Sequence, residues 1–240
     1  KTTLSEAERL AAYAKENGIA LPCFSAGADI VSESRRRESI EKLKRCAELA
    51  AAMGIPFLHH TVLPSLSFTA GSEPFHTLLH RAAEGIREVF DFAASVGVRV
   101  VIEDQGFVFN GCERLERLLE AVGRDVGVVA DLGNILFVGE DPVAFVGRFA
   151  SQIVHVHVKD YLVRSASLPY PGDDWYQTRQ GNYLRGTVVG HGAVDFVTVL
   201  RILQAAGYDG WFCLELGLNK PHQLVNHLCF WSTFLPHPLC

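Results

Sequence analysis

The sequence lacks several features that would assign a chain of 240 residues to particular classes of protein. It has no basic run, and its formal net charge is −5, so the electrostatic footprint of a nucleic-acid-binding protein is absent. No apolar run approaches the roughly 18 residues that a membrane-spanning helix needs. The N-terminus lacks the basic-then-apolar pattern of a signal peptide. We therefore expect a cytoplasmic protein that binds neither nucleic acid nor membrane.

The six cysteines form no CxxC pair and have no regular spacing. Several lie inside apolar segments, as Cys23 does in "LPCFS" and Cys213 in "WFCLEL". This placement is typical of buried thiols in a reducing compartment and favours them over disulfides. A GxGxxG motif opening a first helix is also missing, which removes the main signal of a dinucleotide-binding sheet.

The sequence does contain a repeated pattern, in which an amphipathic helix is followed by a glycine and a short apolar run. In "IEKLKRCAELAAAMG-IPFLHHTVL", Leu43, Cys46, Ala47 and Ala50 share one helical face, and Gly54 sits where a left-handed cap would end the helix. The apolar runs are mostly unbroken, as expected of parallel strands buried on both faces. The repeat predicts right-handed βαβ units, in either a doubly wound sheet or a (β/α)8 barrel.

Seven segments are predicted to be strands: 19–25, 55–62, 98–103, 126–131, 153–159, 187–190 and 210–216. A closed barrel needs about eight. The chain lacks an initiator methionine and opens inside a predicted helix, so we expect the first strand to precede residue 1. The predicted fold is thus an α/β (β/α)8 TIM barrel, one domain over residues 1–240, without its first strand.

Three predicted strands end on a carboxylate: "VRVVIE" on Glu103, "VGVVAD" on Asp131 and "GWFCLE" on Glu215. In a fourth, "IVHVHVKD", alternation places the valines on a packed face and His155 and His157 on the other, with His157 nearer the strand end. The carboxyl ends of barrel strands form the floor of an active site, so the four groups should converge. Carboxylates crowded there without a cation would repel one another. The set therefore predicts one divalent metal ion, for which we favour Mn²⁺ among Mn²⁺, Mg²⁺, Co²⁺ and Zn²⁺.

The succession "IED", "DLGN", "HVHVKD", "GHGAVDF" and "GYDGWFCLEL" resembles the xylose isomerase-like TIM barrel superfamily of sugar-phosphate isomerases and epimerases. The resemblance implies that Glu103, Asp131, His157 and Glu215 bind the metal ion. It further implies that Glu103 and Glu215 are the catalytic pair, which moves a proton beside a carbonyl through a metal-stabilised enediolate. The expected substrate is a small polyhydroxylated carbonyl compound such as a sugar, a sugar phosphate or a hydroxy-keto acid.

Other polar residues are expected to bind the substrate. His60 ends a predicted strand, Gln105 and Asn134 follow proposed ligands, and Lys159 points inward by strand parity. Residues 162–186 show no periodic pattern and are expected to form a lid. The lid contributes further candidates, with arginines that suit a carboxylate or phosphate: Arg164, Trp175 and Arg185.

Three further interpretations remain open. A dehydratase of the inosose or dehydroshikimate type would use a similar metal site on the same fold. An endonuclease IV-like nuclease would need more histidines, and "ALPCFSAG" supplies none. A non-catalytic sugar-binding barrel is the third.

The glycines of Gly190-His191-Gly192 would let the backbone approach a ligand, with phosphate as one candidate. The apolar tail 225–240 is not a typical final helix, and a homo-oligomer interface could cover it.

Overall fold

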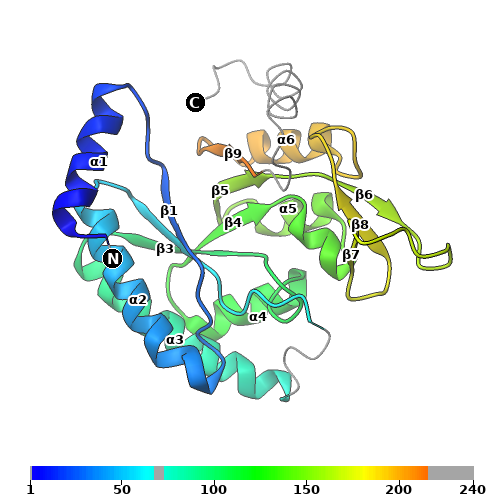
Figure 1. Ribbon diagram of the computed structural model, residues 1–240, viewed down its shortest axis with the longest axis horizontal. Coiled ribbons are helices and arrows are strands. Elements are labelled where there is room, and N and C mark those ends of the chain that lie inside the picture. The colour runs from blue at the N-terminus through cyan, green and yellow to red at the C-terminus, as the bar shows by residue number, and fades with distance from the viewer. Residues whose placement is uncertain (1, 68–72, 216–240) are drawn as a thin grey trace.

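Six parallel strands form a curved sheet at the centre of the computed structural model, which describes residues 2–67 and 73–215 (Figure 1). The strands lie side by side in their order along the chain: β1 (Cys23–Ala26), β2 (Phe57–His60), β3 (Arg99–Glu103), β4 (Gly127–Asp131), β5 (Ile153–Val158) and β9 (Phe212–Leu214). Every neighbouring pair is parallel. Within the described residues β1 and β9 are the two edges, so this part of the chain forms an incomplete barrel of the predicted α/β class.

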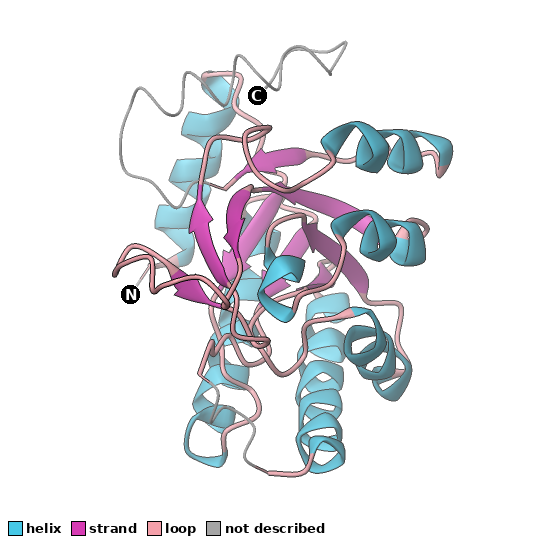
Figure 2. Ribbon diagram, turned by 90° about the vertical axis from the view of Figure 1, so that its right-hand side faces the viewer, coloured by secondary structure: helices cyan, strands magenta, loops and turns pink. Residues whose placement is uncertain are grey.

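The α-helices lie around the outside of the sheet, and all but the first connect its strands (Figure 2). They are α1 (Leu4–Glu16), α2 (Glu33–Ala52), α3 (Phe75–Ser95), α4 (Cys112–Val122), α5 (Pro142–Phe149) and α6 (Phe196–Ala205); the short 3-10 helix η1 (Asn134–Val138) lies in the connection after β4. Gly54 follows α2 with a φ of 68°, the left-handed conformation that the sequence predicted after that helix. Because all six strands run the same way, their carboxyl ends meet at one end of the sheet.

The main hydrophobic core lies between the sheet and the helices. Val156 and Val158 belong to this core and are fully buried, as are Ile102 and Leu58 on neighbouring strands. Alternation along a strand then turns the residues between them toward the inside of the barrel. On β5 those residues are His155 and His157, so the parity inferred from "IVHVHVKD" is confirmed.

The strand predicted at 187–190 is wrong. β9 pairs directly with β5, with Val156 opposite Phe212, and no strand of the described chain lies between them. The backbone N–H groups of Gly190 and Gly192 donate to the carboxylate of Asp160, at 2.9 and 2.7 Å, so they are not available to a parallel ladder. A side-chain acceptor has replaced the neighbouring strand as the hydrogen-bond partner of this segment.

The predicted lid is a small antiparallel sheet rather than an irregular loop. Its strands are β6 (Tyr161–Arg164), β7 (Tyr176–Gln177) and β8 (Tyr183–Gly186), in the order β6-β8-β7. A second hydrophobic cluster lies under it, formed by Phe107, Phe137, Tyr161 and Leu184. The strands are short and half of their residues are exposed, so they lack the apolar run or clean alternation by which the longer strands were predicted.

Other expectations are only partly covered by the described residues. Cys23, Cys46 and Cys112 are half-buried and form no disulfide. No helix in residues 2–67 or 73–215 has both the length and the hydropathy to cross a membrane. The tail 225–240 lies outside the described residues.

We expect Ile102→Ala to lower the free energy of unfolding by about 2–5 kcal/mol, because it removes a large side chain from a site with no solvent exposure. Val163→Ala is the control, since Val163 is 50% exposed and its loss should change stability by at most about 0.5 kcal/mol. Urea denaturation measures both. Equal effects of the two substitutions would contradict the assignment of Ile102 to the core.

Candidate metal centre

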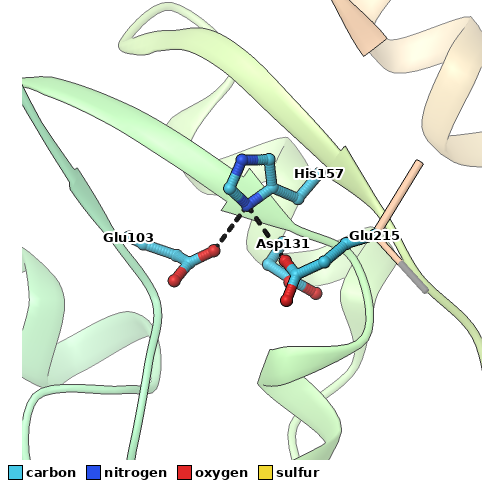
Figure 3. Close-up of side chains that lie close together, drawn as sticks. All are labelled: Glu103, Asp131, His157 and Glu215. Carbon is cyan, nitrogen blue, oxygen red and sulfur yellow. Dashed lines mark hydrogen bonds and ion pairs between the residues drawn. The ribbon is translucent and has the colours of Figure 1, made fainter. Parts of the chain in front are cut away.

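Four side chains from four strand ends meet inside the barrel (Figure 3). Glu103 and Asp131 are the last residues of β3 and β4, His157 lies near the end of β5, and Glu215 follows β9. Each offers one ligand atom, and these atoms all lie within 4.8 Å of one another. The structure therefore brings together all four residues that the sequence pattern selected as ligands.

His157 lies between two of the carboxylates. Its Nδ1 is 2.6 Å from Oε1 of Glu103 and 3.3 Å from Oε2 of Glu215. Burial alone would lower the pKa of His157, but the hydrogen bonds to the two glutamates raise it to about 10. Burial would likewise raise the pKa of Glu103, yet its contacts with His157 and His59 lower it to about 2. Without a metal ion, a protonated histidine thus balances the charge of these glutamates.

Lys159 provides the second positive charge. Its Nζ is 2.9 Å from Oδ2 of Asp131 and 2.8 Å from Oε1 of Glu215. Asp131 also accepts the backbone N–H groups of Gly133 and Asn134 through Oδ1, both at 2.9 Å. Burial raises the pKa of Asp131 to about 6, although Lys159 opposes the shift. The ammonium and the imidazole together offset a cluster of three carboxylates.

The donor set fits a divalent cation. Glu103, Asp131 and His157 are buried, whereas the Glu215 side chain is 46% exposed, so the residues up to 215 cover the centre least on the side of β9. Three carboxylates and one imidazole are typical ligands of Mn²⁺, Mg²⁺, Co²⁺ or Zn²⁺. Burying like charges this close together without a counter-ion is costly, and a divalent ion would supply the positive charge that the protonated His157 now supplies.

His59, which the sequence analysis missed, reaches the centre where His60 does not. The Nε2 of His59 is 3.5 Å from Oε2 of Glu103, and its Nδ1 is 3.1 Å from Oγ of Ser25. His60 is opposite Ile102 in the sheet register and therefore faces the helices; its Nδ1 lies 3.0 Å from its neighbour's carbonyl oxygen. The expectation that His60 lines the centre is therefore wrong, and His59 occupies that place. Strand parity from the core residue Leu58 would have made the distinction.

The remaining predicted residues fall into two groups. Asn134 is buried and its Oδ1 lies 3.4 Å from Nζ of Lys159, so both belong to the edge of the centre. The Oε1 of Gln105 is buried and has no hydrogen-bond partner among the described residues. The lid residues contact the small sheet or its loops instead: Arg164 donates to Pro169, the backbone N–H of Trp175 donates to Gly172, and Arg185 lies 3.7 Å from Asp174.

Comparison with known proteins places the chain in a family. The family described as "Xylose isomerase-like TIM barrel" matches residues 1–228. The chain belongs to this family. The resemblance inferred from the strand-end motifs is thereby confirmed.

Several known proteins are similar in sequence to this xylose isomerase-like barrel. Inosose dehydratase of Geobacillus thermodenitrificans is 30% identical over 140 residues, which cover 55% of this chain and 45% of the relative. The rhizopine catabolism protein MocC of Rhizobium meliloti is 39% identical over 130 residues, 50% of this chain and 37% of the relative. Inosose dehydratase of Geobacillus kaustophilus is 27% identical over 225 residues, 86% of this chain and 70% of the relative. The first two matches span less than half of those relatives.

Solved structures share the fold of this xylose isomerase-like barrel at lower identity. A xylose isomerase domain protein from Planctomyces limnophilus has a TM-score of 0.79 at 17% identity, covering 96% of this chain and 82% of that one. The 3-keto-D-glucoside 4-epimerase YcjR of E. coli has a TM-score of 0.72 at 18% identity, covering 96% and 85%. The IOLI protein with a bound zinc atom has a TM-score of 0.73 at 17% identity, covering 96% and 83%.

We expect metal binding at pH 8 to release about one proton per site, because a histidine ligand must be neutral and the pKa of His157 is about 10 before metal binds. The carboxylates contribute little at this pH, since their pKa values are about 6 or lower. Isothermal titration calorimetry in buffers of different ionisation enthalpy measures the number of protons. A binding enthalpy that is independent of the buffer would contradict the protonation of His157.

Proposed function

We propose that the protein is a divalent-metal-dependent enzyme that moves a proton at the carbon next to a carbonyl group in a small polyhydroxylated substrate. The observation that carries the proposal is the set of three carboxylates and one histidine within 4.8 Å at the carboxyl ends of the strands. The names of the relatives, inosose dehydratases and a keto-glucoside epimerase among them, support the same chemistry.

Glu103, Asp131, His157 and Glu215 would hold the ion. When bound, a divalent ion polarises the carbonyl group and stabilises the negative charge that develops on its oxygen. The structure of the IOLI protein, which is similar in fold, contains a bound zinc atom. Among the ions that suit this donor set, Mn²⁺ is the first that we would test.

Glu103 and Glu215 are the groups that would accept a proton from carbon. Contacts with His157 lower the pKa of both carboxyls against the effect of burial, so both are ionised at neutral pH. They come from β3 and from the end of β9, on either side of His157 (Figure 3). Two carboxylates that approach from different directions can remove the proton and return it elsewhere. Lys159, beside Glu215, would donate a hydrogen bond to a hydroxyl oxygen of the substrate.

Two outcomes can follow from the same proton abstraction. In an isomerase or epimerase, the carboxylate pair returns the proton to the neighbouring carbon or to the opposite face. In a dehydratase, the hydroxyl group on the next carbon leaves instead, and an ammonium group such as that of Lys159 can assist its departure. The match to inosose dehydratase over 86% of this chain supports dehydration as the alternative outcome.

We expect purified protein loaded with Mn²⁺ to convert at least one substrate in a panel of inososes, ketoses and hydroxypyruvate. Glu103→Gln should lower kcat/KM by about 10²–10⁴-fold because it removes the proposed base. Glu113→Gln, on the exposed first turn of α4, is the control. Reaction in D₂O distinguishes the outcomes. Epimerisation incorporates deuterium at carbon and loses no water, whereas dehydration yields a product that is lighter by one water.

Two results would count against the proposed function. The proposed function would be wrong if the wild-type protein bound no divalent ion stoichiometrically under any loading condition. Tight sugar binding with metal present but without turnover or deuterium exchange would instead indicate a non-catalytic binding protein.

A further inference from the structure

A carboxylate of the chain itself fills the concavity formed by the Gly190-His191-Gly192 loop. Asp160, directly after β5, is 1% exposed. Its carboxylate accepts four backbone N–H groups, from Tyr161, Gly190, Gly192 and Val194, at 2.9, 2.9, 2.7 and 3.2 Å. Converging backbone N–H groups of this kind bind anions. The anion that the glycines accommodate here is therefore Asp160, and we call this arrangement of Asp160 with residues 190–194 the Asp160 clasp.

The clasp fits too tightly for a side chain on the loop. A Cβ atom at Gly192 would collide with the carboxylate of Asp160, and it would lie 2.5 Å from the carbonyl oxygen of Tyr161. A second pair of backbone bonds lies beside it: Thr187 donates to the Asp160 carbonyl at 3.0 Å, and Ala193 donates to the Tyr161 carbonyl at 2.9 Å. The backbone directly after Lys159 is thus fixed at several points.

Lys159 is confined at its side chain as well. Its Cβ lies 3.1 Å from the position that a Cβ would take at Gly133, so the loop after β4 packs against the base of the lysine. Its ammonium group then lies between Asp131 and Glu215, and the side chain is only 12% exposed. A lysine on a free strand end could reach solvent, whereas this one is directed back into the centre.

We infer that Asp160 is a positioning residue, which holds Lys159 between Asp131 and Glu215 by locking the end of β5 onto residues 190–194. The inference rests on the proposed function, because it takes Asp131 and Glu215 as metal ligands. An ammonium group held against these oxygens repels a cation and competes with it for them. The clasp therefore keeps a substrate-binding cation in the centre and weakens metal binding in doing so.

The test measures Mn²⁺ affinity of the full chain by titration calorimetry at one pH, and it needs no substrate. Lys159→Gln should tighten binding by about tenfold, because the positive charge that repels the cation is gone. Asp160→Asn should tighten it by several-fold, because an amide cannot accept all four N–H groups and Lys159 is released. In the double variant, Asp160→Asn should add nothing to Lys159→Gln, the signature of one residue acting through the other.

Two further variants separate positioning from folding. Gly192→Ala opens the clasp from the loop side and should reproduce the effect of Asp160→Asn; it carries the test if Asp160→Asn does not fold. Asp141→Asn is the matched control, since Asp141 also accepts backbone N–H groups, from Val143 and Ala144 at 2.6 and 3.0 Å, but at the start of α5. It should leave the Mn²⁺ affinity unchanged, because the N-cap of α5 is remote from Lys159 and asparagine also caps a helix well.

The outcomes are distinct. Wild-type Mn²⁺ affinity in folded Asp160→Asn and Gly192→Ala would overturn the positioning role and leave the proposed function standing. A change that persists in the Lys159→Gln background would also overturn it, because the clasp would then act on the ligands rather than on Lys159. Failure of the wild-type protein to bind Mn²⁺ would overturn the proposed function and this inference together.

Discussion

The mutual repulsion of three carboxylates at the carboxyl ends of β3, β4 and β9 is the constraint around which the centre is organised. Glu103, Asp131 and Glu215 cannot share a largely buried space as anions unless positive charge lies among them. His157 and Lys159 supply that charge, and both are on the strand end that lies between β4 and β9 in the sheet. The alternating inward positions of β5 are therefore what makes the acidic cluster compatible with a folded protein.

Uncharged groups also surround the carboxylates. Asp131 receives two backbone N–H groups from the turn that follows it, and its own N–H donates to the Asp104 carboxyl at 2.8 Å. Burial and the nearby Asp131 and Glu103 raise the pKa of Asp104, which favours its neutral form beside those anions. The acids thus form two groups although the side chains are chemically alike: the pKa is lowered for Glu103 and Glu215 and raised for Asp131 and Asp104.

Much of the fold and centre followed from local patterns in the sequence. The helix–glycine–strand pattern and the carboxylates that end three of the buried runs are encoded within a few residues, and parallel topology then forces the strand ends together. The errors have a different origin. His60 was preferred to His59, although strand parity distinguishes the two. The segment 187–190 was predicted to be a strand because its apolar residues do not reveal that the N–H groups of Gly190 and Gly192 donate to Asp160. The small sheet depends on pairing between short, exposed segments, which leaves little periodic signal.

The clasp closes the chain on itself, because residue 160 and residues 190–194 are joined by hydrogen bonds. The stretch between them, with all of β6, β7 and β8, is thus an excursion whose two ends are pinned at a fixed separation. The cluster of Phe107, Phe137, Tyr161 and Leu184 fixes the small sheet to the barrel, whereas residues 165–175 within the excursion are mostly exposed. Lengthening such a loop costs conformational entropy only slowly, so residues 165–175 can vary in length while the sheet, the clasp and the metal centre stay in place.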